Sequence, residues 1–237
     1  MSIDESAPTN NYYDNVNQTL LESVDPSARV ICELGCGGGA LARAIRNRIG
    51  QPLHYVGVEL MADALERAKP VLDVAVQCNL DEASDWSQHS ALSAALPEAT
   101  FDHVICGDVL EHLYAPEDVV AQAAKRLKPG GSLLTCIPNV QHWSVVAQLL
   151  CGTWPRLDAG LFDRTHIRWF CLADMIQLLT GAGLQVERVI PRVFNPEEGM
   201  EILEYLEPLA QHLGVNPEIY YQQSLPLQYV LVAKRVQ

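Results

Sequence analysis

A carboxylate, a glycine-rich loop and a second carboxylate are the first residues here whose types and spacing could do chemistry. Residues 30–40 read VICELGCGGGA, an apolar run that leads through Glu33 into a loop with four glycines. Glu59 ends the next apolar run, 24 positions after Gly35. Glycines let ligand atoms approach the backbone, and they adopt turns closed to other residues. A carboxylate after the following strand can accept both hydroxyls of a ribose. Together they predict a nucleoside cofactor, whereas the loop alone is also typical of a tight strand-to-helix turn.

Glu33 narrows the choice of cofactor. GCGGGA also satisfies the dinucleotide fingerprint, so a nicotinamide-dependent oxidoreductase is an alternative. However, Glu33 stands two residues before the first glycine, where it suits a cationic amino group better than a pyrophosphate. The chain also lacks a Tyr-x-x-x-Lys pair after the fifth predicted strand. These features argue against a dinucleotide.

Strand-like and helix-like stretches alternate along the chain and must position these residues. Several of the strand-like runs are continuously apolar, as expected when helices cover both faces of a sheet. This alternation predicts an α/β fold with a doubly wound, mostly parallel sheet, in which ligands bind beyond the carboxyl ends of the strands. We expect seven strands, at residues 29–34, 54–60, 73–78, 101–108, 132–138, 185–190 and 228–235.

Composition limits the classes of partner. The 237 residues carry a formal net charge of −13, which disfavours nucleic acid and anionic lipid surfaces. No run of 18 apolar residues predicts membrane insertion, and the polar, acidic first residues do not resemble a secretory signal. Seven cysteines without a CxxC pair suggest buried thiols in a reducing cytoplasm. No cluster of His and acids at helical or hairpin spacing predicts a metal site.

Four motifs resemble those of the class I S-adenosylmethionine-dependent methyltransferases. They are ELGCGGG, GVEL, FDHVICGDVLEHL and RLKPGGSLLTCIPN, in this order and spacing. The resemblance covers roughly residues 12–191 and the last predicted strand. It implies a Rossmann-like methyltransferase fold of seven strands whose last strand runs antiparallel, and QYVLVAKR fits that position.

The resemblance also implies the cofactor-binding residues, with S-adenosyl-L-methionine as cofactor and S-adenosyl-L-homocysteine as product. The glycine loop would hold the methionine part, Glu59 the ribose, and the residue after the third strand the adenine amino group, where either Asn79 or nearby Asp81 could serve. The full expected set is Glu33, Gly35, Cys36, Gly37, Gly39, Glu59, Leu60, Met61, Asn79, Leu80, Gly107, Asp108 and Val109.

Two stretches that interrupt the alternation would bind the methyl acceptor. IPNVQHWSVVAQLLCGTW and GLFDRTHIRWF resemble a subgroup of these enzymes found with glycan assembly genes, whose better-known relatives methylate quinone precursors. We therefore expect O-methylation of a small molecule, most simply a sugar or glycan-linked hydroxyl, with a quinone precursor or other aromatic metabolite as the alternative. A non-catalytic cofactor-binding protein is the alternative outside enzymes.

Methyl transfer to a hydroxyl usually needs a base, and imidazole titrates near neutrality. The expected catalytic residues are His142, His166, Asp163 and His112, of which Asp163 would orient His166 or act itself. The expected acceptor-binding residues are Tyr12, Tyr13, Asn139, Trp143, Arg164 and Arg168. Each histidine could instead organise a loop, and each aromatic residue could simply pack.

The domain organisation is expected to be simple. Residues 1–237 read as one methyltransferase domain, with an N-terminal helix at 10–25 and lid-like insertions at 140–170 and 191–223. The second insertion has an acidic and an apolar face, which would suit a lid or a homodimer contact.

Overall fold

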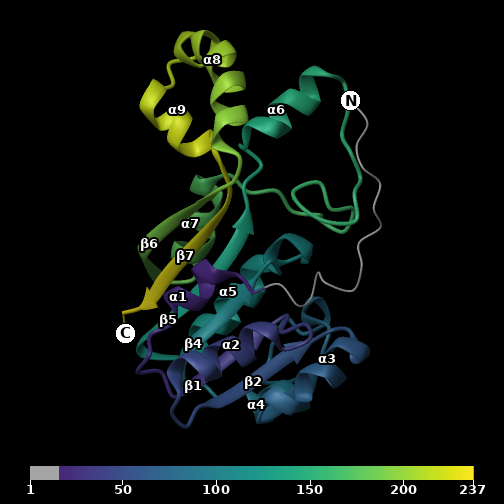
Figure 1. Cartoon of the computed structure of the whole chain (residues 1–237). Coiled ribbons are helices and arrows are strands. Elements are labelled where there is room, and N and C mark those ends of the chain that lie inside the picture. Colours follow the sequence, from purple (N-terminus) through teal and green to yellow (C-terminus); the bar gives the residue numbers. More distant parts are fainter. Residues whose placement is uncertain (1–15, 237) are drawn as a thin grey trace.

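The computed structural model describes residues 16–236, in which one seven-stranded sheet carries helices on both faces (Figure 1). The strands are β1 (Val30–Leu34), β2 (His54–Glu59), β3 (Val74–Gln77), β4 (Phe101–Gly107), β5 (Leu127–Pro138), β6 (Leu184–Val193) and β7 (Pro226–Arg235). The helices are α1 (Gln18–Ser23), α2 (Ala40–Ile49), α3 (Ala62–Ala68), α4 (Ser90–Ala95), α5 (Pro116–Arg126), α6 (Trp143–Leu150), α7 (Leu172–Gly181), α8 (Pro196–His212) and α9 (Pro217–Ser224).

The strand order is β3-β2-β1-β4-β5-β7-β6, with β7 antiparallel to both of its neighbours and every other pair parallel. The predicted fold class, including the antiparallel last strand, is therefore confirmed. The direction in which successive strands are added to the sheet reverses between β1 and β4. In doubly wound sheets a ligand crevice forms at such a point, beyond the carboxyl ends of the strands.

Two apolar layers hold the helices on the sheet. On one face, α1 and α2 pack against inward residues of β1, β2, β4, β5 and β7, including Ile31, Tyr55 and Ile105. On the other face, α4, α5 and α7 cover Leu34, Val104 and further strand residues. Leu34, just before the glycine loop, belongs to one layer, and Leu41 and Ala42, just after it, belong to the other, so both ends of the loop are anchored in close-packed core.

Three predicted elements differ from the structure by more than two residues at one end, and the other strand bounds agree to within two residues. β5 begins at Leu127 instead of residue 132, because Leu127 pairs with Phe101 before a shift in register. β6 continues to Val193 instead of residue 190, because Arg192 and Val193 pair with the start of β7. The predicted N-terminal helix at 10–25 is α1, at Gln18–Ser23, and its part before residue 16 lies outside the described residues.

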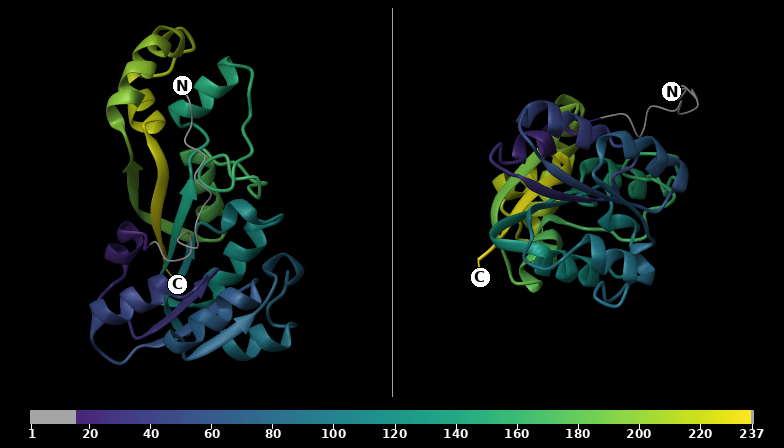
Figure 2. Two further views of the ribbon diagram at one scale, coloured as in Figure 1. Left: turned by 45° about the vertical axis from the view of Figure 1, so that its right-hand side comes forward. Right: turned by 90° about the horizontal axis from the view of Figure 1, so that it is seen from below.

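The two predicted insertions rise beyond the carboxyl ends of the strands. Figure 2 shows α8 and α9 facing α6 and the loop after it, above the body of the sheet. All seven cysteines are unpaired, and five of them are buried, whereas Cys151 is exposed and Cys171 is half-buried. Among the described residues, no helix is long and apolar enough to cross a membrane.

Candidate active site

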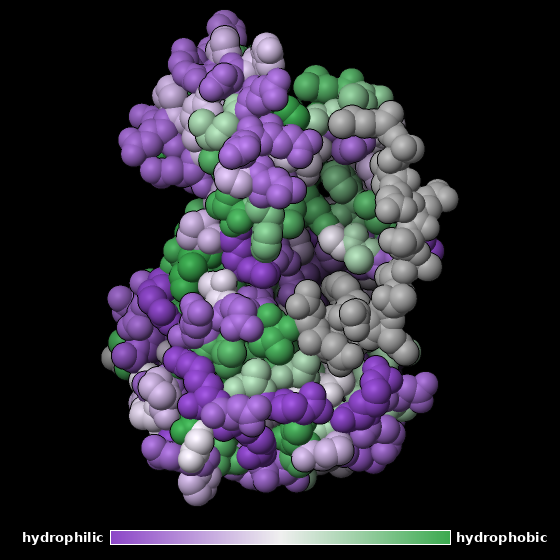
Figure 3. Space-filling view, in the orientation of Figure 1, coloured by the Kyte–Doolittle hydropathy of each residue, from purple (hydrophilic) through white to green (hydrophobic). Residues whose placement is uncertain are grey.

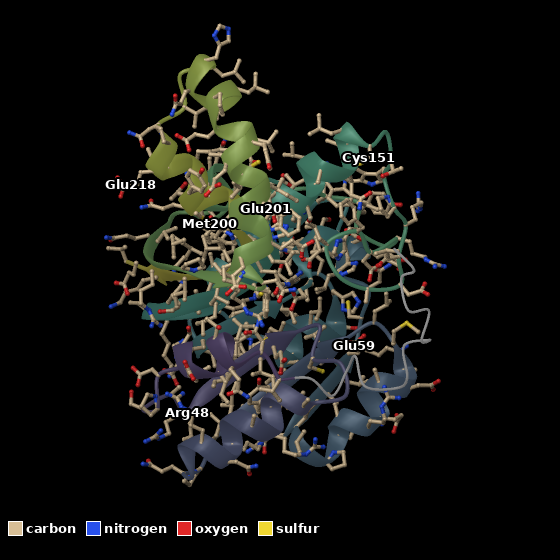
Figure 4. The ribbon with its side chains drawn as sticks, turned by 45° about the horizontal axis from the view of Figure 1, so that its top comes forward. Arg48, Glu59, Cys151, Met200, Glu201 and Glu218 are labelled. Carbon is tan, nitrogen blue, oxygen red and sulfur yellow. The ribbon has the colours of Figure 1, made fainter. Side chains whose placement is uncertain are left out.

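A cavity of about 1120 Å³ opens between the carboxyl ends of the strands and the inserted segments. Figure 3 shows it as a hollow between the upper lobe and the body of the molecule. In Figure 4, Glu59 lies on the sheet side, whereas Cys151 and Met200 mark α6 and α8 on the opposite side. The lining includes twelve of the thirteen residues predicted to bind the cofactor: Glu33, Gly35, Cys36, Gly37, Glu59, Leu60, Met61, Asn79, Leu80, Gly107, Asp108 and Val109.

The glycine loop is built for close approach to its surroundings. Gly35 and Gly37 have φ values of +70° and +51°, in the left-handed region that other residues rarely adopt. A Cβ on Gly35 would lie 2.4 Å from the Cγ2 atom of Val109. Gly39, the thirteenth predicted residue, lies outside the cavity lining and is the N-cap of α2, where a Cβ would meet Val71 and Ala68. The structure thus gives a packing reason for this glycine, and its contact with the cofactor stays a prediction.

Glu59 connects the glycine loop to the start of α3. Its Oε2 atom accepts a hydrogen bond from the Gly37 amide and its Oε1 atom from the Met61 amide, each at 2.9 Å. Carboxylate oxygens accept more than one hydrogen bond each, so both retain capacity for ribose hydroxyls. Leu60 and Met61, which follow, expose about half of their surface to the cavity region and suit the face of an adenine ring.

Glu33 lies deeper in the same cavity. Its side chain is buried and accepts a hydrogen bond of 2.7 Å from the Tyr55 hydroxyl. Burial raises the pKa of Glu33 from 4.5 to about 8, against the lowering effect of the Tyr55 hydrogen bond. No cation contacts this carboxyl among the described residues, so a bound ammonium group would complete it.

The loop after β3 contains both residues considered for the adenine amino group. Asn79 is tied up locally, because its Oδ1 atom accepts from the Asp81 amide and its Nδ2 atom donates to Glu82. Asp81 accepts a hydrogen bond of 2.8 Å from the Tyr114 amide, across the cavity edge. The Asp81 carboxylate has a second oxygen, which makes it the better placed acceptor of the two.

The loop after β4 brings Asp108, whose backbone has a positive φ, into the lining of the cavity. Asp108 has a φ of +55°, and its Oδ1 atom accepts a hydrogen bond of 2.6 Å from the Gln228 amide group. Burial raises the pKa of Asp108, although Arg192 nearby opposes this. Arg192 lines the cavity from the part of β6 that extends beyond the predicted end at residue 190. No sequence motif singles it out.

Three of the four predicted catalytic residues line the same cavity as Glu59. These are His112, Asp163 and His166. The ring centroids of His112 and His166 are 4.8 Å apart, in an edge-to-face arrangement. Asp163 does not orient His166 through a side-chain bond. It accepts from the amide and the hydroxyl of Thr165, and His166 uses the Leu161 carbonyl oxygen instead, 3.1 Å from its Nδ1 atom.

Glu111 is a residue of this group that the sequence interpretation did not select. It is 1% exposed, and neither carboxylate oxygen has a hydrogen-bond partner among the described residues. Its Oε1 atom lies 3.9 Å from the Nε2 atom of His166. Burial raises the pKa of Glu111 well above its usual value, and Asp108 adds to this. One ligand atom from each of Glu111, His112 and His166 lies within 4.8 Å of the others, although the sequence predicted no metal cluster.

Most of the remaining predicted residues lie outside the cavity lining. His142, Asn139, Trp143 and Arg168 are absent from the cavity lining, and Tyr12 and Tyr13 lie outside the described residues. Arg168 donates to the Tyr114 carbonyl oxygen. Arg164 does line the cavity, but it forms an ion pair with Asp158 there.

Asn139 and His142 organise the start of α6 instead of facing the cavity. The Asn139 amide group donates to the carbonyl oxygens of Gln223 and Pro226, and its Oδ1 atom accepts from the Gln141 amide. His142 caps α6 by accepting from the Ser144 amide. Burial lowers the pKa of His142 to about 4, so its ring is neutral at pH 7. Their placement therefore gives no support to the predicted catalytic and acceptor-binding roles.

Comparison with known proteins agrees with this geometry. The model of the methyltransferase domain family matches residues 9–189, which is about three quarters of the chain. The chain thus belongs to the methyltransferase domain family, and more particularly it is a class I S-adenosylmethionine-dependent methyltransferase. The enzyme class and cofactor predicted from the sequence are confirmed.

Curated relatives and solved structures extend the comparison. The chain is 30% identical over 190 residues to a ubiquinone biosynthesis O-methyltransferase of Thiobacillus denitrificans, covering 76% of this chain and 77% of that protein. It is 29% identical over 184 residues to the same-named protein of Idiomarina loihiensis, covering 73% and 69%. A methyltransferase from Mesorhizobium loti superposes with a TM-score of 0.58 at 18% identity, covering 92% and 96%. That structural likeness shows the fold alone.

Proposed function

We propose that this enzyme transfers the methyl group of S-adenosylmethionine to a hydroxyl group of a small aromatic molecule. The cavity that carries the proposal contains the cofactor-binding loop and, at its other side, buried groups that can take up or release a proton. A hydroxyl acceptor needs such groups, because its oxygen must lose a proton as it is methylated.

The cofactor supplies a methyl group on a positively charged sulfur. The residues present fit such a ligand. Glu33 would hold its amino group, Glu59 its ribose hydroxyls, and Leu60 and Met61 would flank its adenine. Gly107 also lines the cavity, and a larger residue there would displace the Leu20 side chain, because an added Cβ would lie 2.8 Å from it. The many carboxyl groups of the lining favour a ligand with net positive charge.

The acceptor would lie between the cofactor residues and the cluster of Glu111, His112 and His166. Phe194 and Arg192 line the same cavity, with the guanidinium carbon 5.2 Å from the centre of the Phe194 ring. The Arg192 guanidinium and the Phe194 ring together offer a flat surface, against which an aromatic ring could stack. Trp143, which the sequence led us to expect in acceptor binding, is not part of the lining, and neither are Trp154 and Trp169, which would otherwise suit the face of a sugar ring.

An aromatic acceptor is therefore preferred over the sugar first expected from the sequence. The names of the curated relatives support the same choice, because they describe O-methyltransferases of ubiquinone biosynthesis. We also propose, from the unpaired buried cysteines, that the enzyme works in a reducing compartment such as the cytoplasm.

The proposal is tested by measuring S-adenosylhomocysteine release with matched acceptors. Catechol and dihydroxybenzoates should support turnover, and the products should be mono-methyl ethers by mass spectrometry. Methyl glucoside and glucuronate, at the same concentrations, should not. Turnover with the sugars alone would restore the original expectation, and turnover with amines alone would contradict O-methylation.

A further inference from the structure

We propose that Arg192 binds a carboxylate group of the methyl acceptor, so that the enzyme selects acceptors that carry one negative charge. This inference deepens the proposed function and rests on it. Arg192 lies near the end of β6 and lines the cavity together with Phe194 and Gln228. The residue is half-buried. A guanidinium group therefore forms part of the wall against which the acceptor would lie.

The charges of the lining single out Arg192. Seven carboxyl groups and two guanidinium groups line the cavity within residues 16–236. The other guanidinium, that of Arg164, is already paired with Asp158. Arg168, which the sequence also led us to expect in acceptor binding, lies outside the lining and donates to a backbone carbonyl oxygen. No carboxylate in the described part of the chain forms an ion pair with Arg192, so its charge is the one that an acceptor could match.

Hydrogen bonds hold the Arg192 guanidinium by one end and leave one edge open. Its Nη1 atom donates to the Oε1 atom of Gln228, its partner in register on β7, and lies 3.8 Å from the sulfur of Cys136 on β5. Within residues 16–236, neither Nε nor Nη2 forms a hydrogen bond. These two nitrogens donate in parallel along one edge of the group, which matches the two oxygens of a carboxylate.

Gln228 orients Arg192 without neutralising it. The Nε2 atom of Gln228 donates to the Oδ1 atom of Asp108 at 2.6 Å, and its Oε1 atom accepts from Arg192, so a neutral amide lies between the two charged groups. Burial also raises the pKa of Asp108, which weakens this carboxyl as a counter-ion for the guanidinium. The guanidinium is thus fixed in position while its charge stays available to a ligand.

Phe194 indicates the kind of anion. Its ring is 46% exposed, it lines the cavity, and its centre lies 5.2 Å from the guanidinium carbon of Arg192. An aromatic acceptor packed against Phe194 would bring a carboxylate attached to its own ring alongside the guanidinium. A phosphate group would carry up to two charges into a cavity with seven carboxyl groups, so the single charge of a carboxylate is favoured.

Two acceptors that differ in charge but little in size test the proposal. These are 3,4-dihydroxybenzoate and 3,4-dihydroxybenzamide, and kcat/KM is measured for both. The wild type should prefer the carboxylate by at least about tenfold, mainly through KM, because a paired guanidinium and carboxylate form strong charge-assisted hydrogen bonds. Arg192→Gln should bring the ratio to about one, and Arg192→Lys should keep part of the preference. Each ratio compares two acceptors on the same protein, so a general loss of activity in a variant cancels.

Matched variants separate this role from a structural one. Arg188→Gln removes another arginine of β6, which lies outside the lining and donates to the Ser23 carbonyl oxygen. Arg164→Gln removes the paired guanidinium of the lining. Both should keep the wild-type ratio within about twofold, whereas Arg192→Glu should reverse the preference toward 3,4-dihydroxybenzylamine. A wild-type ratio near one, an equal fall in the control variants, or a stronger preference for 3,4-dihydroxyphenylphosphonate than for the benzoate would overturn the proposal.

A binding measurement on the wild-type protein does not depend on variants that could fail to fold. With S-adenosylhomocysteine bound, 3,4-dihydroxybenzoate should bind more tightly than the benzamide by calorimetry, and more weakly at high salt. It should also shift the Nε–H signal of Arg192 in nitrogen-15 nuclear magnetic resonance, which the benzamide should not. Equal affinities and an unmoved Arg192 signal would contradict the proposal. Tight binding of the benzoate without methylation of any hydroxyl would refute the proposed function alone, and hydroxyl methylation without a preference for the carboxylate would refute this inference alone.

Discussion

The Nε2 atom of His166 lies 3.9 Å from the Oε1 atom of Glu111, and both side chains are buried at the wall of the cavity that contains the cofactor residues. The two loops that carry them are joined by backbone hydrogen bonds at Glu111. The relationship is thus a fixed part of the fold. It places groups able to handle a proton within the same space as the glycine loop, which is what methyl transfer to a hydroxyl needs.

Replacing Glu59 by alanine should abolish tight cofactor binding. The change removes the ribose acceptor and also the hydrogen bonds that Glu59 accepts from Gly37 and Met61. With hydrogen bonds to a charged group at about 1.5–3 kcal/mol each, we expect the affinity for S-adenosylmethionine to fall by at least ~100-fold. Calorimetric titration measures it, with Glu66→Ala, an exposed carboxylate on α3, as the control. Equal losses in both variants would show that Glu59 has no special role.

Replacing Gly35 by alanine should damage both stability and cofactor binding. The new Cβ would overlap Val109 at 2.4 Å, and the φ of +70° is unfavourable for alanine. Gly50→Ala is the matched control, because Gly50 has a φ of +61° but a Cβ added there would meet no atom within 4 Å. Denaturant unfolding should show a loss of about 1 kcal/mol for Gly50→Ala from the backbone alone, and a larger loss for Gly35→Ala. A smaller loss at Gly35 than at Gly50 would contradict the packing described for the loop.

Cofactor binding should release a proton near neutral pH because of Glu33. Before the cofactor binds, its carboxyl, with a pKa of about 8, is mostly protonated at pH 7, and an ammonium group favours the ionised form. Affinity should therefore rise with pH up to about 8, by no more than about tenfold per pH unit for one proton. Calorimetry in buffers of different ionisation enthalpy measures the release, which Glu33→Gln should remove. Proton uptake instead of release would contradict this account.

The same carboxyl affects folding with the opposite trend. The folded protein binds the Glu33 proton more tightly than the unfolded chain, in which the pKa of Glu33 is near 4.5. Its contribution therefore makes the cofactor-free protein less stable as pH rises from about 4.5 to 8. Urea unfolding at pH 6 and pH 8 should show a smaller loss of stability in Glu33→Gln than in the wild type. If the wild type and Glu33→Gln lose the same stability between pH 6 and pH 8, the burial of Glu33 is not the cause of that loss.

His142→Ala should cost stability but little activity. His142 caps α6 and lies outside the cavity lining, so its loss should lower the free energy of unfolding by about 1 kcal/mol and change turnover by less than about threefold. His142→Asn should recover part of the stability, because asparagine is also a good cap. A loss of turnover beyond ~100-fold in a folded His142→Ala protein would return His142 to the chemistry.

The sheet and the cofactor half of the site could be predicted from the sequence for local reasons. Apolar runs mark buried strands, glycines mark the loop, and carboxylates such as Glu33 and Glu59 directly follow or end these runs. Twelve of the thirteen predicted cofactor residues line the cavity because parallel strands end at one edge of the sheet. Gly39 shows the limit of this reasoning, since a glycine needed for packing and one needed for a ligand look alike in sequence.

The acceptor half could not be predicted as well, because it depends on contacts between distant segments. Residue types alone favoured His142 and Asn139, yet their local hydrogen bonds organise the start of α6. Glu111 carried one local signal, as an acid beside a histidine just after a strand. Its burial and its distance to His166 follow only from the way the second loop folds over the first.

The most direct test of the central claim is to follow the methyl group itself. The enzyme would be incubated with S-adenosylmethionine labelled with carbon-13 in the methyl group and with catechol-type acceptors, and the product would be examined by nuclear magnetic resonance. The account predicts that the labelled carbon appears as an aryl methyl ether, and that Glu59→Ala forms none at the same cofactor concentration. A labelled methyl group found on nitrogen or carbon would contradict the account. So would a label that stays on the cofactor with every hydroxyl acceptor, although the protein binds the cofactor tightly.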